Sequence, residues 1–226
     1  DTLHQARVSS VGPGALGGVD VAAFGAALLG PPPDSYKWQQ PPQPLSSGPV
    51  YDGWDELSVF LGPQIGADDW VCETSDPVTR IRWWGSYLGW KEPVPPYLPD
   101  AFHLTMWTDV PAGTDQEFSH PGQVIWGVDC FDYTWEFVGW DYSPITHEIE
   151  ATFLFTQELR PEEYFQQPGV SAIYWLSVAA FEPLGQPTDY PWGWKTRPRD
   201  PTSPAPDDAV VIWAPTDPQP GMVFQA

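Results

Sequence analysis

The sequence predicts an all-β protein, a jelly-roll-like β-sandwich with an extra arm at its N-terminus. Apolar and polar residues alternate over short runs, which is the period of a strand with one buried face. Clusters of Pro and Gly separate these runs, and the chain holds 29 Pro and 20 Gly in 226 residues. Helical periodicity is scarce, and only one helical turn is expected, in residues 160–166.

The first 36 residues differ from the rest because they are rich in Gly and Ala and end in a run of three Pro residues. We expect residues 1–36 to form an arm and residues 37–226 to form the sandwich with a Pro-rich C-terminal stretch. A short helix and an extended segment both remain open for the apolar part of the arm. Its large apolar side chains are Val19, Val21, Phe24, Leu28 and Leu29. Each is worth about 1.5 to 3 kcal/mol when buried, so we expect the arm to contact something outside its own sandwich.

Strands are expected wherever the alternation is regular. It is clear in residues 79–84, 102–107 and 148–156. Residues 173–180 are apolar on both faces, which is typical of a strand in the centre of a buried sheet. Residues 208–213 interrupt the last Pro-rich stretch and predict a final strand.

The charge balance excludes two classes of partner. The net charge is −21, from 30 acidic and only 9 basic residues. Such a surface repels the phosphates of nucleic acids and of anionic lipids. No run of 18 apolar residues is present, so no membrane span is expected.

Export is expected from two features. The chain begins at Asp1 rather than at Met, as a processed exported protein would. Cys72 and Cys130 are the two cysteines, and in an oxidising compartment we expect them to form a disulfide. The alternative is a pair of buried free thiols. We therefore expect a secreted or cell-surface protein.

Seven short motifs follow one another along the chain and together carry a resemblance to a known family. They are KWQQPP at 37–42, ADDWVC at 67–72, PVTRIRWWGS at 77–86, WTDVPA at 107–112, IYWL at 173–176, GWKT at 193–196 and DDAV at 207–210. Over about residues 37–213 the chain resembles a domain of unknown function that recurs in exported bacterial proteins. The resemblance implies an extracellular β-sandwich and implies no activity.

Motifs of hydrolytic enzymes are missing. The chain has no G-x-S-x-G sequence, and the HE pair at His147 fails the H-E-x-x-H pattern because Ala151 stands at the fifth position. Acidic residues that could act as paired carboxylates are Asp141, Glu148, Glu150, Glu162 and Glu163. Because acidic residues are common in this chain, we expect these side chains to be solvated and the protein not to be an enzyme.

Calcium is the one metal for which the sequence offers ligands, and no other cofactor is indicated. The acidic doublets Asp68–Asp69 and Asp207–Asp208 could supply carboxylate oxygens from sandwich loops. The alternative is that these side chains cap turns through local backbone hydrogen bonds.

Tryptophan is the strongest compositional signal, with 14 residues. The sandwich core, an interface between copies and a sugar-binding surface all remain open as explanations. Trp84 and Trp107 fall on the polar side of their strands and are therefore the candidates for stacking on sugar rings.

Two functions follow from these observations. The first is a structural subunit of an extracellular assembly, such as a filament, sheath or surface layer, joined to copies of itself by arm or strand exchange. The alternative is a secreted carbohydrate-binding module that binds polysaccharide through surface Trp residues.

Overall fold

A computed structural model describes residues 36–45, 49–143, 147–183, 189–200, 202–203, 205, 209–213 and 224–225. The chain divides into two units, Asp1–Ser35 and Tyr36–Ala226, and all described residues belong to the second. The arm expected in residues 1–36, with Val19, Val21, Phe24, Leu28 and Leu29, lies outside the described residues except for Tyr36.

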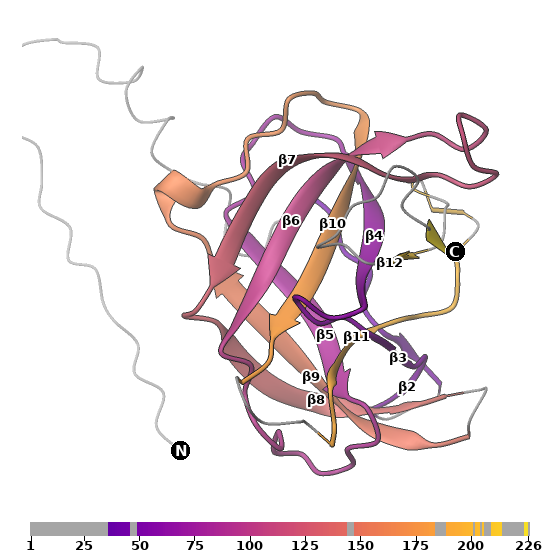
Figure 1. The fold of residues 1–226 in the computed structure, drawn as a ribbon, viewed down its shortest axis with the longest axis vertical. Coiled ribbons are helices and arrows are strands. Elements are labelled where there is room, and N and C mark those ends of the chain that lie inside the picture. The colour runs from indigo at the N-terminus through magenta and orange to yellow at the C-terminus, as the bar shows by residue number, and fades with distance from the viewer. Residues whose placement is uncertain are drawn as a thin grey trace, which may run out of the picture. The chain divides into compact units, whose positions relative to one another are not determined.

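The fold is an all-β sandwich of two sheets, as the sequence predicts (Figure 1). One sheet has seven strands in the order β1 (Gln43–Pro44), β2 (Val50–Asp52), β8 (Thr134–Tyr142), β9 (Ile149–Glu158), β5 (Arg80–Tyr87), β11 (Trp192–Lys195) and β3 (Asp55–Leu57). The other has six, in the order β13 (Phe224–Gln225), β12 (Val210–Trp213), β4 (Gln64–Cys72), β10 (Ala172–Phe181), β6 (Ala101–Val110) and β7 (His120–Cys130). All neighbours are antiparallel except β2 and β8.

The strands expected from alternation are present. Residues 79–84, 102–107, 148–156 and 208–213 correspond to β5, β6, β9 and β12. β12 is not the final strand that was expected, because β13 follows it. The doubly apolar residues 173–180 form β10, which lies between β4 and β6 in the centre of its sheet. The single turn expected in residues 160–166 is the 3₁₀ turn η2 (Pro161–Glu163).

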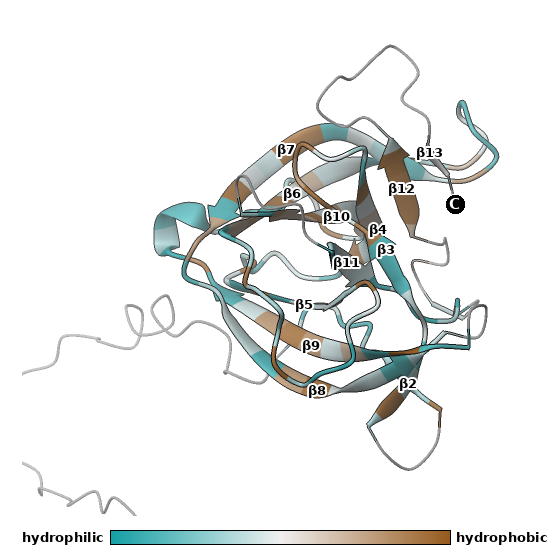
Figure 2. Cartoon of the chain, turned by 60° about the horizontal axis from the view of Figure 1, so that its bottom comes forward, coloured by the Kyte–Doolittle hydropathy of each residue, from teal (hydrophilic) through white to brown (hydrophobic). Residues whose placement is uncertain are grey.

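Aromatic side chains fill the space between the two sheets. Figure 2 shows the two sheets facing each other, with β6, β7 and β10 in one and β5, β8 and β9 in the other. Phe102 lies at the centre, with its ring 5.0 Å from those of Trp83 and Phe155 and 4.9 Å from that of Trp192. These four side chains are almost completely buried. Much of the tryptophan content therefore serves the core, where large aromatic side chains contribute most to burial.

The seven-stranded sheet closes on itself at one end. β2 and β3 lie at opposite sides of this sheet, yet only Gly53 and Trp54 separate them in the chain. The Gly53 amide donates to the carbonyl of Tyr142 in β8, and the carbonyl of Trp54 accepts from the amide of Thr196, which follows β11. The β2–β3 segment thus joins both sides, and we call the closed circle of β2, β3, β8, β9, β5 and β11 the ring.

The expected disulfide between Cys72 and Cys130 is absent, because both cysteines are buried free thiols. The strand register gives the reason. Cys72 lies opposite Ala172 at the start of β10, whereas Cys130 lies opposite Phe102, which is itself opposite Ala180 near the end of β10. Eight residues of a strand span about 26 Å, and a disulfide requires Cα atoms within about 7 Å. The prediction was wrong because strand membership in the sequence does not reveal the position along the sheet.

Candidate functional site

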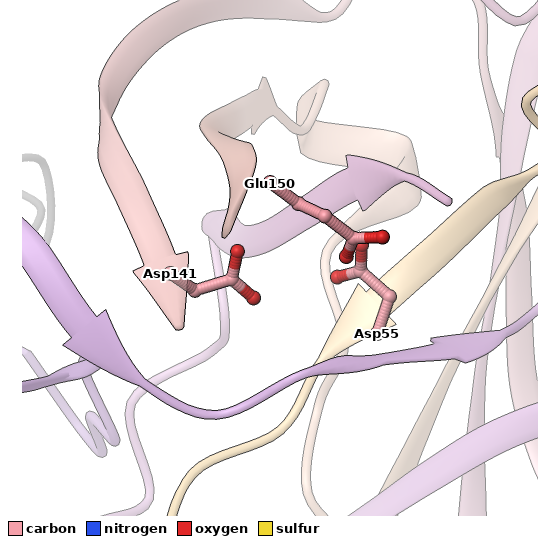
Figure 3. Close-up of side chains that lie close together, drawn as sticks. All are labelled: Asp55, Asp141 and Glu150. Atoms are coloured by element: carbon pink, nitrogen blue, oxygen red, sulfur yellow. The ribbon is translucent and has the colours of Figure 1, made fainter. Parts of the chain in front are cut away.

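Four ionisable side chains meet inside the ring: Asp55, Asp141, Glu150 and Lys195, which we call the Lys195 cluster. The Lys195 ammonium lies 2.6 Å from Asp55 Oδ1 and also contacts Asp141 Oδ2 directly. One carboxylate oxygen from each of the three acidic residues lies within 4.8 Å of the others. Figure 3 shows the Asp55 and Glu150 carboxylates facing each other and the Asp141 carboxylate pointing toward them.

Strand pairing brings these residues together in two pairs. Asp141 in β8 is directly opposite Glu150 in β9, and Asp55 in β3 is directly opposite Lys195 in β11. In a flat sheet the two pairs would be far apart, because β8 and β3 are separated by three strands at about 4.8 Å spacing. The closure of the ring removes that distance and places both pairs around one interior point.

A β-bulge in β8 determines where Asp141 points. Between Phe137 and Gly139 the register with β9 shifts by one residue. After the shift Trp140 packs on the same side as Phe137, with ring centroids 4.7 Å apart, so Asp141 points to the opposite face. Without the bulge, simple alternation would place Asp141 on the face of Phe137 and away from the cluster.

The ring leaves almost no solvent around the basic residue. The exposed fraction of the side chain is 3% for Lys195, 1% for Asp55 and 2% for Asp141. Glu150 is half-buried, and its Oε1 accepts a hydrogen bond from the Gly89 amide at 2.5 Å. A carboxylate oxygen of Glu150 lies within 4.8 Å of one from Asp55, and Ser86 is buried.

Burial governs the charges of the cluster. It raises the pKa of Glu150 to about 8, with the Asp55 charge adding to the effect, so Glu150 is mostly protonated at neutral pH. Burial also raises the pKa of Asp55 against the opposing influence of Lys195, and it lowers the pKa of Lys195. Both of these shifts favour the uncharged forms of the amine and the acid.

The arrangement can hold a proton between Asp55 and Glu150 and one cation among the three carboxylates. The Lys195 ammonium already fills the place that a metal ion would take. Three carboxylates would otherwise suit a hard divalent cation, which prefers oxygen ligands. The charged atoms of Lys195, Asp55 and Asp141 are enclosed by the ring, so a substrate molecule could not reach them from solvent.

A shallow depression lies elsewhere, at the turn between β7 and β8. It has a volume of about 610 Å³. Its lining residues are Leu98, Pro99, Asp100, Phe131, Tyr133, Thr134 and Trp135. None of the cluster residues borders it, so the depression and the cluster are separate features.

The two tryptophans expected to stack on sugars do not form one surface. Trp107 is only 9% exposed, and its indole N–H donates to the Ser177 hydroxyl at 2.9 Å. Trp107 packs in a second group of buried apolar side chains on the six-stranded sheet. Trp84 is half-buried in β5 of the other sheet. The expected exposure of Trp107 was wrong, because residues on both faces of β6 are covered.

The calcium candidates are only partly described. Asp69 is buried and Asp68 is half-buried, both in β4, and the Asp68 carboxylate accepts a hydrogen bond from the Asp69 amide at 3.0 Å. The contact lies within strand β4, whereas both sequence interpretations placed this doublet in a loop or turn. Asp207 and Asp208 lie outside the described residues.

The acidic residues expected to be solvated divide into two groups. Glu148 and Glu162 are exposed, and Glu163 pairs with Arg160. Asp141 and Glu150 instead belong to the cluster, which corrects the expectation for these two. The missed signal was Lys195 in the GWKT motif, one of only 9 basic residues in the chain.

Comparison with known proteins gives one match. Residues 36–224 match a domain of unknown function (DUF7901). The chain belongs to this family. The DUF7901 match contains β1 to β12 and all four residues of the Lys195 cluster. No curated protein and no solved structure matches the chain. Among the described residues, no helix is long and apolar enough to cross a membrane.

Proposed function

We propose that this DUF7901 domain is a non-catalytic structural subunit of a secreted or cell-surface assembly, joined to copies of itself by strand exchange. The observation that supports it best is the edge strand β7. It has 11 residues and pairs only with β6 among the strands that the structure describes. The outer N–H and C=O groups of such a strand form a template for pairing with another chain.

The exposed side chains of β7 favour a protein partner. Val124 is 57% exposed in the middle of the strand and is flanked by polar Gln123 and half-buried Ile125. An apolar side chain on an edge strand is the opposite of the charged residues that usually protect such edges. Val124 therefore marks the position on the β7 edge where an apolar side chain of an added strand would pack.

The occupant that we propose is the apolar stretch of residues 19–29 from a second copy. Added strands gain affinity from backbone hydrogen bonds and specificity from alternate side chains. Insertion of one copy's segment into the next is heterologous, so it propagates into a fibre unless the rotation closes a ring of subunits.

The test uses sedimentation velocity on the full chain and two matched substitutions. Val124→Lys places a charge on the β7 edge, and Val94→Lys places the same charge on a loop Val that is 64% exposed. We expect the full chain and Val94→Lys to sediment as large assemblies, and Val124→Lys to sediment as monomers. Removal of residues 1–35 should also give monomers.

Two results would contradict this function. One is a monomeric full chain at all concentrations, and the other is assembly of the shortened chain or Val124→Lys to the same size as the full chain. Circular dichroism of each variant establishes that the sandwich is folded when the comparison is made.

Polysaccharide binding is the second candidate, and the depression at the β7–β8 turn favours it. Phe131 is 67% exposed there and lies beside Tyr133, Trp135 and the acidic Asp100. Exposed aromatic rings next to hydrogen-bonding groups suit the faces and hydroxyls of sugars. Retention on insoluble polysaccharide that falls at least severalfold in Phe131→Ala, but not in Val170→Ala, would support this candidate; no retention of the unmodified chain would exclude it.

A further inference from the structure

The Lys195 cluster combines groups that can react with each other. A primary amine with no access to bulk solvent touches two carboxyl groups, and a third carboxyl group lies against one of them. Here Lys195 Nζ is held against Asp141 and Asp55 while Glu150 supplies a proton donor, which is more than a structural ion pair requires.

We propose that Lys195 Nζ and the side chain of Asp141 condense to an amide, which joins β11 covalently to β8. The bond would cross the ring and would be a self-formed modification of the folded chain. It does not depend on the assembly proposed above.

The reaction balances without any co-reactant. The neutral amine attacks Cγ of the Asp141 carboxylic acid, the new C–N bond forms, and the C–OH bond breaks. The hydroxyl leaves with one proton from Nζ as a water molecule. No atom is oxidised or reduced, and the charges of one ammonium and one carboxylate disappear together.

The cluster supplies what this reaction needs. Burial lowers the pKa of Lys195, which favours the nucleophilic amine, as in other desolvated lysines that act as nucleophiles. Asp55 Oδ1 lies 2.6 Å from Nζ, and a carboxyl oxygen of Glu150 lies within 4.8 Å of one from Asp55. This pair can therefore accept the proton that Nζ loses and return it to the leaving hydroxyl.

Position and burial both drive the condensation forward. The folded ring holds amine and acid in contact, which replaces an encounter in solution by a step within one molecule. Burial disfavours the separated charges of Lys195 and Asp141, whereas an amide is neutral and needs only hydrogen-bond partners. The buried amide is therefore favoured over the buried ion pair.

Nζ contacts the carboxyl group of Asp141 directly, and a bond to it would restrain the ring. Lys195 and Asp55 are already directly opposite on the paired strands β11 and β3, so a bond between them would add little. β9 and β5 separate β8 from β11 in the sheet. A bond from Lys195 to Asp141 would prevent the ring from opening, and Asp55 would remain free to exchange protons with Glu150.

The test is the intact mass of the denatured full chain, followed by peptide mapping. We expect the unmodified chain to weigh one water molecule less than its sequence requires. Lys195→Arg, which keeps the charge but not the nucleophilic amine, should have its full mass. Lys91→Arg, at an exposed lysine near Glu148, should lack one water as the unmodified chain does. Glu150→Gln should slow the loss of water after refolding.

Peptide mapping of the unmodified chain keeps the test decisive if Lys195→Arg does not fold. We expect one branched peptide that contains Lys195 and Asp141. The full sequence mass in the folded unmodified chain would overturn the proposal, and so would a branch at Asp55 or a metal ion bound at full sequence mass.

Discussion

Gly193 shows how closely single residues are fitted around the Lys195 cluster. A Cβ atom at this position would lie 2.7 Å from Asp55 Cβ and 2.7 Å from Leu88 Cδ1. We expect Gly193→Ala to lower the free energy of unfolding by about 1 to 3 kcal/mol, the usual cost of overpacking. Urea unfolding measures it. Gly169→Ala, where a Cβ meets atoms only at ordinary distances, should change the free energy much less; equal losses would contradict this account.

Glu150 gives the cluster a pH dependence with a defined sign. Its pKa is raised to about 8 in the folded protein, so the folded chain binds this proton more tightly than the unfolded chain does. The stabilisation is complete below the ordinary Glu pKa of about 4.3 and is lost as the pH rises through about 8.

Glu150→Gln should remove this loss, because the amide imitates the protonated form. We expect the melting temperature of the unmodified chain to fall, relative to that of Glu150→Gln, as the pH is raised from about 5 to about 9. Glu148→Gln, at an exposed neighbour, should follow the unmodified chain. If the melting temperatures of the unmodified chain and of Glu150→Gln changed in parallel with pH, Glu150 would not be the group with the raised pKa.

Residue types alone predicted part of the site. Asp141 and Glu150 were recognised as paired carboxylates but were expected to be solvated. Their burial depends on the bulge that redirects Asp141 and on Lys195, which is 45 residues or more away in the sequence. A contact between side chains so far apart in the sequence leaves no pattern in the residues around either of them.

At the scale of elements, the bulge in β8 determines which way the Asp141 carboxylate points. Gly139 has φ +146°, and a Cβ there would lie 2.2 Å from the carbonyl oxygen of Pro49. We expect Gly139→Ala to separate β2 from β8 and to expose Asp141, with a loss of about 2 kcal/mol or more in the free energy of unfolding. Urea unfolding and hydrogen exchange of Trp140 measure it, and an unchanged stability would argue against the bulge.

Strands were predictable where one face is apolar and the other polar. β5, β6 and β9 have that pattern, and β10 has the doubly apolar pattern of a central strand. The short strands β2, β3 and β11 were not recognised, because three or four residues are too few for a period to be visible. These strands form the ring, so the site could not be assembled from the sequence.

At the scale of the whole molecule, the domain combines the ring with a long edge strand, β7. The ring joins β2, β3, β8, β9, β5 and β11 without a free strand, whereas β7 ends the six-stranded sheet without a further strand in the described residues. The two thiols stay apart because they lie near opposite ends of the six-stranded sheet. The Lys195 cluster therefore joins strands of the ring through buried charged groups.

The most direct test of this account compares hydrogen exchange in the full chain and in Lys195→Met. Mass spectrometry measures the exchange in each segment. If the cluster holds the ring closed, the variant should exchange faster in Asp55–Leu57, Thr134–Tyr142 and Trp192–Lys195. Protection should persist in β6 and β10, which contribute no residue to the cluster. Unchanged protection in the three ring segments, or equal loss in β6 and β10, would contradict the account.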